Sequence, residues 1–187
     1  KFVSGQPETG GDLADDLERI ASNFGPENIA ACIVEPIAGS TGTLVPPKGY
    51  LQRLREICDK HGILLIFDEV ITGWGRTGSS FASHEFGVTP DIMTMAKATT
   101  NGVVPMGVVA CKDEIYDAVM DASPMGSVEL FHGYTYSGIP VAVAAALAVQ
   151  DIFEKEDIFE RAKNLAPYFQ KGLFSLQDLD AVDNIRG

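Results

Sequence analysis

The sequence has 187 residues, 45% hydrophobic and 21% charged, which is enough for one sizeable hydrophobic core. Acidic residues outnumber basic ones by 26 to 14, so the formal net charge is −12, and we expect neither a nucleic-acid partner nor an anionic membrane. The longest apolar run, residues 139–149, is too short to span a bilayer. Cys32, Cys58 and Cys111 lack CxxC spacing and no signal peptide is evident, so we expect reduced thiols in a cytoplasmic protein.

Apolar periodicity and turn residues divide the chain into alternating helices and strands. In chain order we expect a loop over 1–10, a helix over 11–24, a strand over 29–36, a turn-rich stretch over 37–49, a helix over 50–60, a strand over 63–70, a glycine-rich turn and a loop, strands over 91–97 and 106–112, and helices over 113–120, 140–153 and 157–175. The first helix is expected to be amphipathic, with an apolar face made of Leu13, Leu17, Ile20 and Phe24. Pro140 falls near the first position of its helix, and Pro167 is a candidate break in the last one.

This alternation predicts an α/β fold with a mainly parallel sheet and helices on both faces. In such sheets, ligands bind at the carboxyl ends of the strands. Glu35, Asp68 and Lys97 each fall at the carboxyl end of a predicted strand. We therefore expect three ionisable groups along one edge of the sheet.

The residue types at this edge admit several chemistries. Lys97 ends the apolar run 92–96, so we expect its amine to be partly desolvated, as an amine nucleophile requires. The pair Asp68 and Glu69 is compatible with a helix cap, a turn, a metal ligand or a partner for a cationic heterocycle. A lysine and a carboxylate are what pyridoxal phosphate needs, but a lysine at a strand end is also compatible with a solvated surface group. Composition and periodicity therefore predict a site without naming its cofactor.

Longer motifs are more specific. Residues 31–109, with EPIAGSTG, FDEVITG and MAKATTNG, and residues 131–148, FHGYTYSGIPVAVAAALA, resemble the central part of a class III pyridoxal-phosphate aminotransferase. Asp68 and Lys97 lie 29 residues apart, as the family pattern requires. The resemblance implies the large domain of a fold-type I enzyme over 1–153, followed over 154–187 by a linking helix and the start of a truncated C-terminal small domain.

The resemblance also implies roles for individual residues. Lys97 matches the lysine that forms the Schiff base with pyridoxal 5′-phosphate and later carries a proton. Asp68 matches the carboxylate paired with the pyridinium nitrogen. Val70 matches the residue packed against the ring, on the face that Asp68 would share in an extended strand.

Further positions are carried over in the same way. Thr135, in HGYTYSG, matches the threonine that binds the cofactor phosphate from the neighbouring subunit of a homodimer. Glu35 and Glu69 are expected to support the cofactor site from around it. Arg76, in GRTG, is expected to be structural, with a place near a substrate carboxylate as the alternative. The histidines show no metal-ligand spacing, and we expect no metal.

Within the family, the motifs are most similar to those of ω-amino acid:pyruvate (β-alanine:pyruvate) aminotransferases. Ser40 and Ile71 stand where ornithine- and γ-aminobutyrate-type members carry glutamate and glutamine. Ala98 and Thr99 stand where Gly-Leu or Gln-Val is more familiar, a difference expected to affect packing or specificity.

The expected reaction is transfer of an amino group from an ω-amino acid or amine to a keto acid such as pyruvate. The family's phosphate loop and its substrate-binding arginine would lie outside these 187 residues. One alternative is therefore a central fragment that is inactive alone. Another is a different class III chemistry, aminomutase or decarboxylase action.

Overall fold

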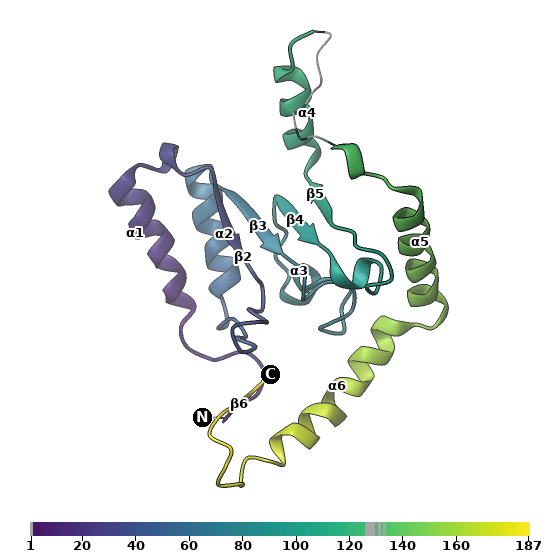
Figure 1. Cartoon of the computed structure of the whole chain (residues 1–187). Helices are drawn as coiled ribbons and strands as arrows, with labels where there is room; N and C mark the ends of the chain where they lie inside the picture. Colours follow the sequence, from purple (N-terminus) through teal and green to yellow (C-terminus); the bar gives the residue numbers. More distant parts are fainter. Residues whose placement is uncertain (1, 126–129, 131, 133) are drawn as a thin grey trace.

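A four-stranded mixed sheet organises the computed structural model, which describes residues 2–125, 130, 132 and 134–187 (Figure 1). The strands run in the order β2-β3-β4-β5, with bounds β2 (Ala31–Val34), β3 (Leu64–Asp68), β4 (Ile92–Met95) and β5 (Val108–Cys111). β2, β3 and β4 are parallel, and β5 is antiparallel to β4. The predicted α/β fold with a mainly parallel sheet is confirmed.

The α-helices agree closely with the sequence pattern. Their bounds are α1 (Asp15–Phe24), α2 (Tyr50–His61), α3 (Ala82–Phe86), α4 (Asp113–Ala122), α5 (Pro140–Lys155) and α6 (Ile158–Phe174). Short 3₁₀ turns add η1 (Gly11–Ala14), η2 (Pro26–Asn28), η3 (Lys97–Thr99) and η4 (Tyr134–Tyr136). Pro140 opens α5 as expected, whereas α6 continues through Pro167. The short helix α3 was expected to be loop.

One face of the sheet holds the core. Leu65 and Phe67 of β3 are fully buried, and they pack with Leu51, Leu54 and Cys58 of α2. The buried residues of α2 repeat every three or four positions, so they form one face of the helix, which packs on the sheet.

The opposite face of the sheet is more open. The register aligns Ile33 with Ile66 and Thr94 with Val109. Because Asp68 lies opposite Thr94 and two residues after Ile66, all of these side chains are on the same face of the sheet as Asp68. Ile33 is 62% exposed and Val109 is 69% exposed. Among the described residues, the helices that pack closely on the sheet therefore cover the face that bears Phe67. The expectation of helices on both faces of the sheet holds for that face.

Helix α1 buries a different line of residues from the predicted one. Ala14, which precedes α1, and Ala21 are fully buried, whereas Leu13 is 61% exposed and Phe24 is 69% exposed. The small alanine side chains allow α1 to lie close to its neighbours, and Leu17 completes the buried line. The helix was predicted correctly, but most of the expected inward face was wrong.

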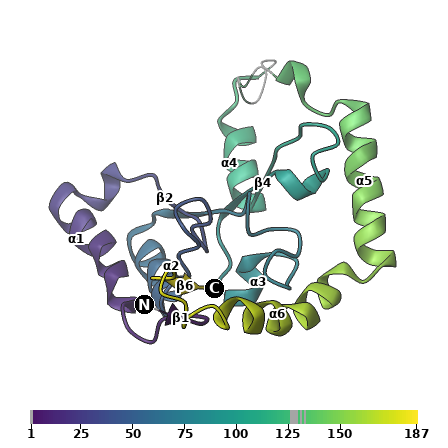
Figure 2. The ribbon, with the colours of Figure 1, turned by 60° about the horizontal axis from the view of Figure 1, so that its bottom comes forward.

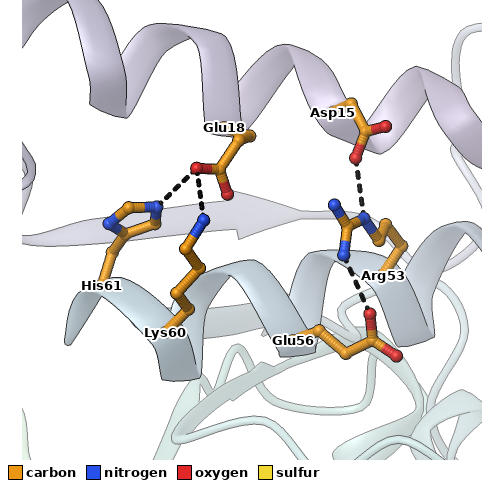
Figure 3. Close-up of polar contacts among 6 residues, drawn as sticks. All are labelled: Asp15, Glu18, Arg53, Glu56, Lys60 and His61. Atoms are coloured by element: carbon orange, nitrogen blue, oxygen red, sulfur yellow. Dashed lines mark hydrogen bonds and ion pairs between the residues drawn. The ribbon is translucent and has the colours of Figure 1, made fainter.

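Two groups of ion pairs join α1 to α2 (Figure 3). Glu18 Oε1 accepts hydrogen bonds from Lys60 at 2.7 Å and from His61 at 3.0 Å. Arg53 of α2 donates to Asp15 of α1 at 2.7 Å and, within α2, to Glu56 at 3.1 Å. These contacts set how the two helices lie along each other.

The two ends of the described chain lie side by side (Figures 1 and 2). β1 (Phe2–Val3) pairs in parallel with β6 (Ile185–Arg186), although residues 1–10 were expected to be loop. From the far end of the sheet, α5 and α6 lead the chain back to this pair (Figure 2). Among the described residues, no helix is both long and apolar enough to cross a membrane.

The predicted strand over 63–70 is shorter than expected. β3 ends at Asp68, and Val70 is the first residue of a turn. The expectation that Val70 continues an extended strand on the face of Asp68 is therefore wrong. The backbone turns here because the Glu69 carbonyl accepts the Gly73 N–H at 2.9 Å.

Candidate active site

The three predicted ionisable groups lie at one edge of the sheet, as expected. Glu35 directly follows β2, Asp68 ends β3, and Lys97 follows β4 by two residues. The register of the parallel pair β3 and β4 sets Asp68 beside Thr94, three residues before Lys97. Asp68 and Lys97 therefore belong to neighbouring strand ends.

Asp68 is half-buried and partly engaged. Its Oδ1 accepts the backbone N–H of Val70 at 3.0 Å, which fixes the orientation of the carboxylate. Among the described residues, no hydrogen bond or ion pair to Oδ2 is found. A carboxylate held by one oxygen and open at the other is suited to accept a hydrogen bond from a protonated ring nitrogen.

Lys97 has an unusual backbone conformation. It begins η3 with a φ of 43°, in the left-handed region, which costs a non-glycine residue about 1–2 kcal/mol. Its side chain is exposed, so the expected desolvation of the amine is wrong for this chain. Among the described residues, its ammonium has no ion-pair partner within 4.0 Å. The amine is therefore available to an incoming aldehyde.

The turn at Lys97 is closed by hydrogen bonds from Thr99. Both the backbone N–H and the hydroxyl of Thr99 donate to the Ala96 carbonyl, each at 2.9 Å. The hydroxyl oxygen accepts the indole N–H of Trp74 at 3.0 Å. Sequence reasoning assigned no role to Trp74 and treated Thr99 only as a departure from the family pattern.

Glu69 does not face the open side of the edge. Its side chain is fully buried and accepts three hydrogen bonds, from the hydroxyl of Thr72 at 2.8 Å and from the N–H groups of Ala82 and Ser83 at 2.7 Å each. Ala82 and Ser83 begin α3, and their N–H groups have no partner within the helix. The helix-cap alternative considered for the carboxylate pair therefore describes Glu69, which braces the turn beyond Asp68.

Glu35 braces a second loop. Its Oε2 accepts the N–H of Gly39 at 3.1 Å, and Ala38 pairs with Leu44 across the same loop. Gly39 lies close to Ile71, because a Cβ at Gly39 would meet the Ile71 Cδ1 at 2.9 Å. The loop next to Ser40 is thus packed on the turn that follows Asp68.

Two further predicted positions are exposed at the surface. Thr135 is exposed in η4, and no hydrogen bond among the described residues joins it to Asp68 or Lys97. Arg76 is exposed and lines a cavity of about 490 Å³ together with Ile71 and Thr72. Both alternatives for Arg76 stay predictions.

The geometry defines a class of protein: an α/β fold in which two neighbouring parallel strands lead at their carboxyl ends to a half-buried carboxylate and to an exposed lysine. The family model "Aminotransferase class-III" matches residues 7–187. The chain belongs to the class III aminotransferase family, whose members use pyridoxal phosphate.

Individual relatives agree with this assignment. The chain is 58% identical to an omega-aminotransferase of Caulobacter vibrioides, covering 98% of this chain and 42% of that protein. It is 54% identical to a beta-alanine–pyruvate aminotransferase of Pseudomonas aeruginosa, covering 99% of this chain and 42% of that protein. The chain therefore spans less than half the length of these curated relatives.

Solved structures show the same fold. A thermostable omega transaminase mutant from Pseudomonas jessenii aligns with a TM-score of 0.90 at 39% identity, over 95% of this chain and 39% of that one. An amine transaminase from an uncultivated Pseudomonas species, in its PLP-bound form, aligns with a TM-score of 0.84 at 44% identity, over 90% and 38%.

Proposed function

We propose that this chain carries the lysine and the carboxylate of a pyridoxal-phosphate-dependent transaminase. The proposed reaction moves an amino group from an ω-amino acid or amine to a keto acid such as pyruvate. The observation that carries the proposal is the placement of Asp68 and Lys97 at the ends of paired parallel strands. The names of the relatives support the substrate class.

The residues present fit the cofactor. Pyridoxal phosphate supplies an aldehyde that condenses with amines and a pyridinium ring that accepts an electron pair. Lys97 supplies an amine that no described carboxylate pairs with, and in the loaded enzyme that amine would carry a proton from the substrate carbon next to nitrogen to the cofactor. Asp68 would pair with the ring nitrogen, and the Val70 N–H on Oδ1 holds the carboxylate in place.

The arrangement of the whole protein is proposed from the same residues. We assign residues 1–153 to the cofactor-binding large domain and 154–187 to a linking helix and the start of the small domain. The exposure of Thr135 supports a homodimer in which it binds the phosphate of the cofactor in the neighbouring subunit. The three free thiols support a cytoplasmic location.

Covalent trapping tests the site. The protein is mixed with pyridoxal phosphate and treated with borohydride, and the modified lysine is identified by peptide mass spectrometry. We expect Lys97 to be modified and Lys97→Ala to lose the modification, whereas Lys48→Ala, which removes an exposed lysine paired with Glu8, should keep it. Trapping that persists in Lys97→Ala would overturn the assignment of Lys97.

The second part of the test concerns the reaction. Asp68→Ala should still be trapped but should transfer amino groups about 100-fold more slowly, because the ring loses the partner that keeps it protonated. Donor consumption that depends on pyruvate identifies amino transfer, and consumption without pyruvate identifies aminomutase or decarboxylase chemistry.

A second candidate concerns the 187 residues by themselves. Because they span 42% of the relatives' length, they can form a folded piece that binds the cofactor weakly and catalyses nothing alone. Amino transfer by the purified chain would exclude this candidate. Absence of trapping and of transfer, with a cooperative unfolding transition, would support it.

A further inference from the structure

The turn that holds Lys97 depends on one buried hydroxyl. Thr99 is 3% exposed, and its hydroxyl and N–H both donate to the Ala96 carbonyl, so Lys97 is enclosed between the two ends of the turn. Water cannot easily replace these bonds at a buried site. The left-handed conformation of Lys97 is therefore maintained by where the Thr99 hydroxyl points.

Trp74 determines where that hydroxyl points. Its indole N–H donates to Thr99 Oγ1 at 3.0 Å, so the hydroxyl accepts from Trp74 and donates to Ala96 in one chain of hydrogen bonds. The indole packs against two other rings, with centroid distances of 5.0 Å to Phe81 and 6.2 Å to Phe153 of α5. Packing therefore orients the donor without any help from a ligand.

We infer that Trp74 and Thr99 are positioning residues, whose hydrogen bond sets the backbone conformation of Lys97 and so the place of its amine. The inference rests on the proposed function of Lys97 and adds to it two residues that do not touch the reacting atoms. Trp74 lies six residues after Asp68, on the turn that Glu69 braces. The hydrogen bond between Trp74 and Thr99 therefore connects the turn after β3, the strand that ends at Asp68, to the turn after β4 that contains Lys97.

The first measurement needs no cofactor. Trp74 is the single tryptophan of the sequence, so the ¹⁵N-labelled chain gives one indole N–H resonance. We expect Thr99→Val to speed hydrogen exchange at this indole and at the backbone amide of residue 99. Thr99→Ser, which keeps the hydroxyl, should restore both. Unchanged exchange at residue 99 in Thr99→Val would overturn the inference.

The second measurement is the rate of borohydride trapping at Lys97. Loss of one net hydrogen bond predicts a rate about threefold to tenfold lower in Thr99→Val and in Trp74→Phe. The double variant should be no slower than the slower single variant, because both substitutions remove the same bond. Additive losses in the double variant would count against a shared bond.

One control variant separates positioning from stability. Thr100 is as buried as Thr99, and its hydroxyl donates to the Val104 carbonyl instead. Thr100→Val should lower the unfolding temperature but leave indole exchange and trapping unchanged, whereas a trapping rate that follows the unfolding temperature across all variants would overturn the inference. If Thr99→Val does not fold, Trp74→Phe, which keeps a ring against Phe81 and Phe153, is tested instead by exchange at the backbone amide of residue 99 and by the trapping rate.

The failure of the inference and that of the proposed function are distinguishable. Lys97-dependent trapping with the same rate in wild type, Thr99→Val and Trp74→Phe would overturn the positioning role and keep the function. No trapping at Lys97 in the wild-type chain would contradict the proposed function, and the exchange rates alone would then decide whether the pair holds the turn.

Discussion

At the scale of single residues, the two adjacent carboxylates after β3 have different tasks. Asp68 is half-buried and uses one oxygen to accept the Val70 N–H. Glu69 is fully buried and uses both oxygens on Thr72 and on the first N–H groups of α3. One of the pair can therefore serve a ligand, while the other holds the turn that positions it.

Glu69 should contribute strongly to stability. In Glu69→Gln, an amide nitrogen replaces one acceptor oxygen and faces a buried donor, so we expect the free energy of unfolding to fall by about 2 kcal/mol. Urea unfolding measures the loss. The matched control is Glu85→Gln, at an exposed residue that accepts from Ser79, which should change stability by less than about 0.5 kcal/mol. Equal losses in the two variants would contradict this account of Glu69.

At the scale of elements, α1 and α2 are joined by a small buried line of alanines and by ion pairs at its side (Figure 3). Hydrogen bonds from Lys60 and then from His61 hold the pKa of Glu18 below its ordinary value, against the opposing effect of burial. A carboxyl whose pKa is lower in the folded state stabilises the fold above the pKa of the unfolded state. That stabilisation disappears as the pH falls through the folded-state pKa.

The contact between α1 and α2 should therefore weaken in acid. We expect Glu18→Gln to be less stable than the wild type at pH 7, with a difference that shrinks below the ordinary carboxyl pKa and vanishes once Glu18 is protonated. Urea unfolding from pH 7 to pH 3 measures the difference. A difference that stays constant over this range would show that the carboxylate charge of Glu18 does not matter.

At the scale of the whole molecule, Asp91 ties the sheet together at the edge opposite the candidate site. Its side chain is 7% exposed and accepts the Leu65 N–H of β3 at 2.7 Å, Arg55 of α2 at 2.8 Å and Lys112 beyond β5 at 2.6 Å. Burial alone would raise the pKa of Asp91, but Lys112, the Leu65 N–H and Arg55 together hold it below its ordinary value.

Removing the charge of Asp91 should destabilise the whole sheet. We expect Asp91→Asn to lower the free energy of unfolding by about 3 kcal/mol, because two cations lose their buried partner. Since the folded-state pKa is lowered, the contribution is present above the ordinary carboxyl pKa and is lost in stronger acid. Asp59→Asn removes an exposed partner of the same Arg55 and should cost less than about 1 kcal/mol. Thermal and urea unfolding compare the two variants.

The sequence by itself determined most of the helices and the strands of the main sheet, and the edge at which they present their ionisable groups. Several of these features are local. The apolar residues of α2 repeat regularly, Gly62 ends that helix, and Asp68 and Lys97 follow apolar runs, so a linear pattern suffices to predict them. The long motifs also determined the family.

Tertiary structure alone decided how those groups are held. Glu69 finds its donors in α3, thirteen and fourteen residues ahead, and Trp74 meets Thr99 twenty-five residues on, which no local period encodes. The buried face of α1 depended on which side chains its neighbours left room for, so Ala21 was buried and Phe24 was not. Long-range packing and hydrogen bonding decide these details, because the groups that pack and bond with one another come together only when the chain folds.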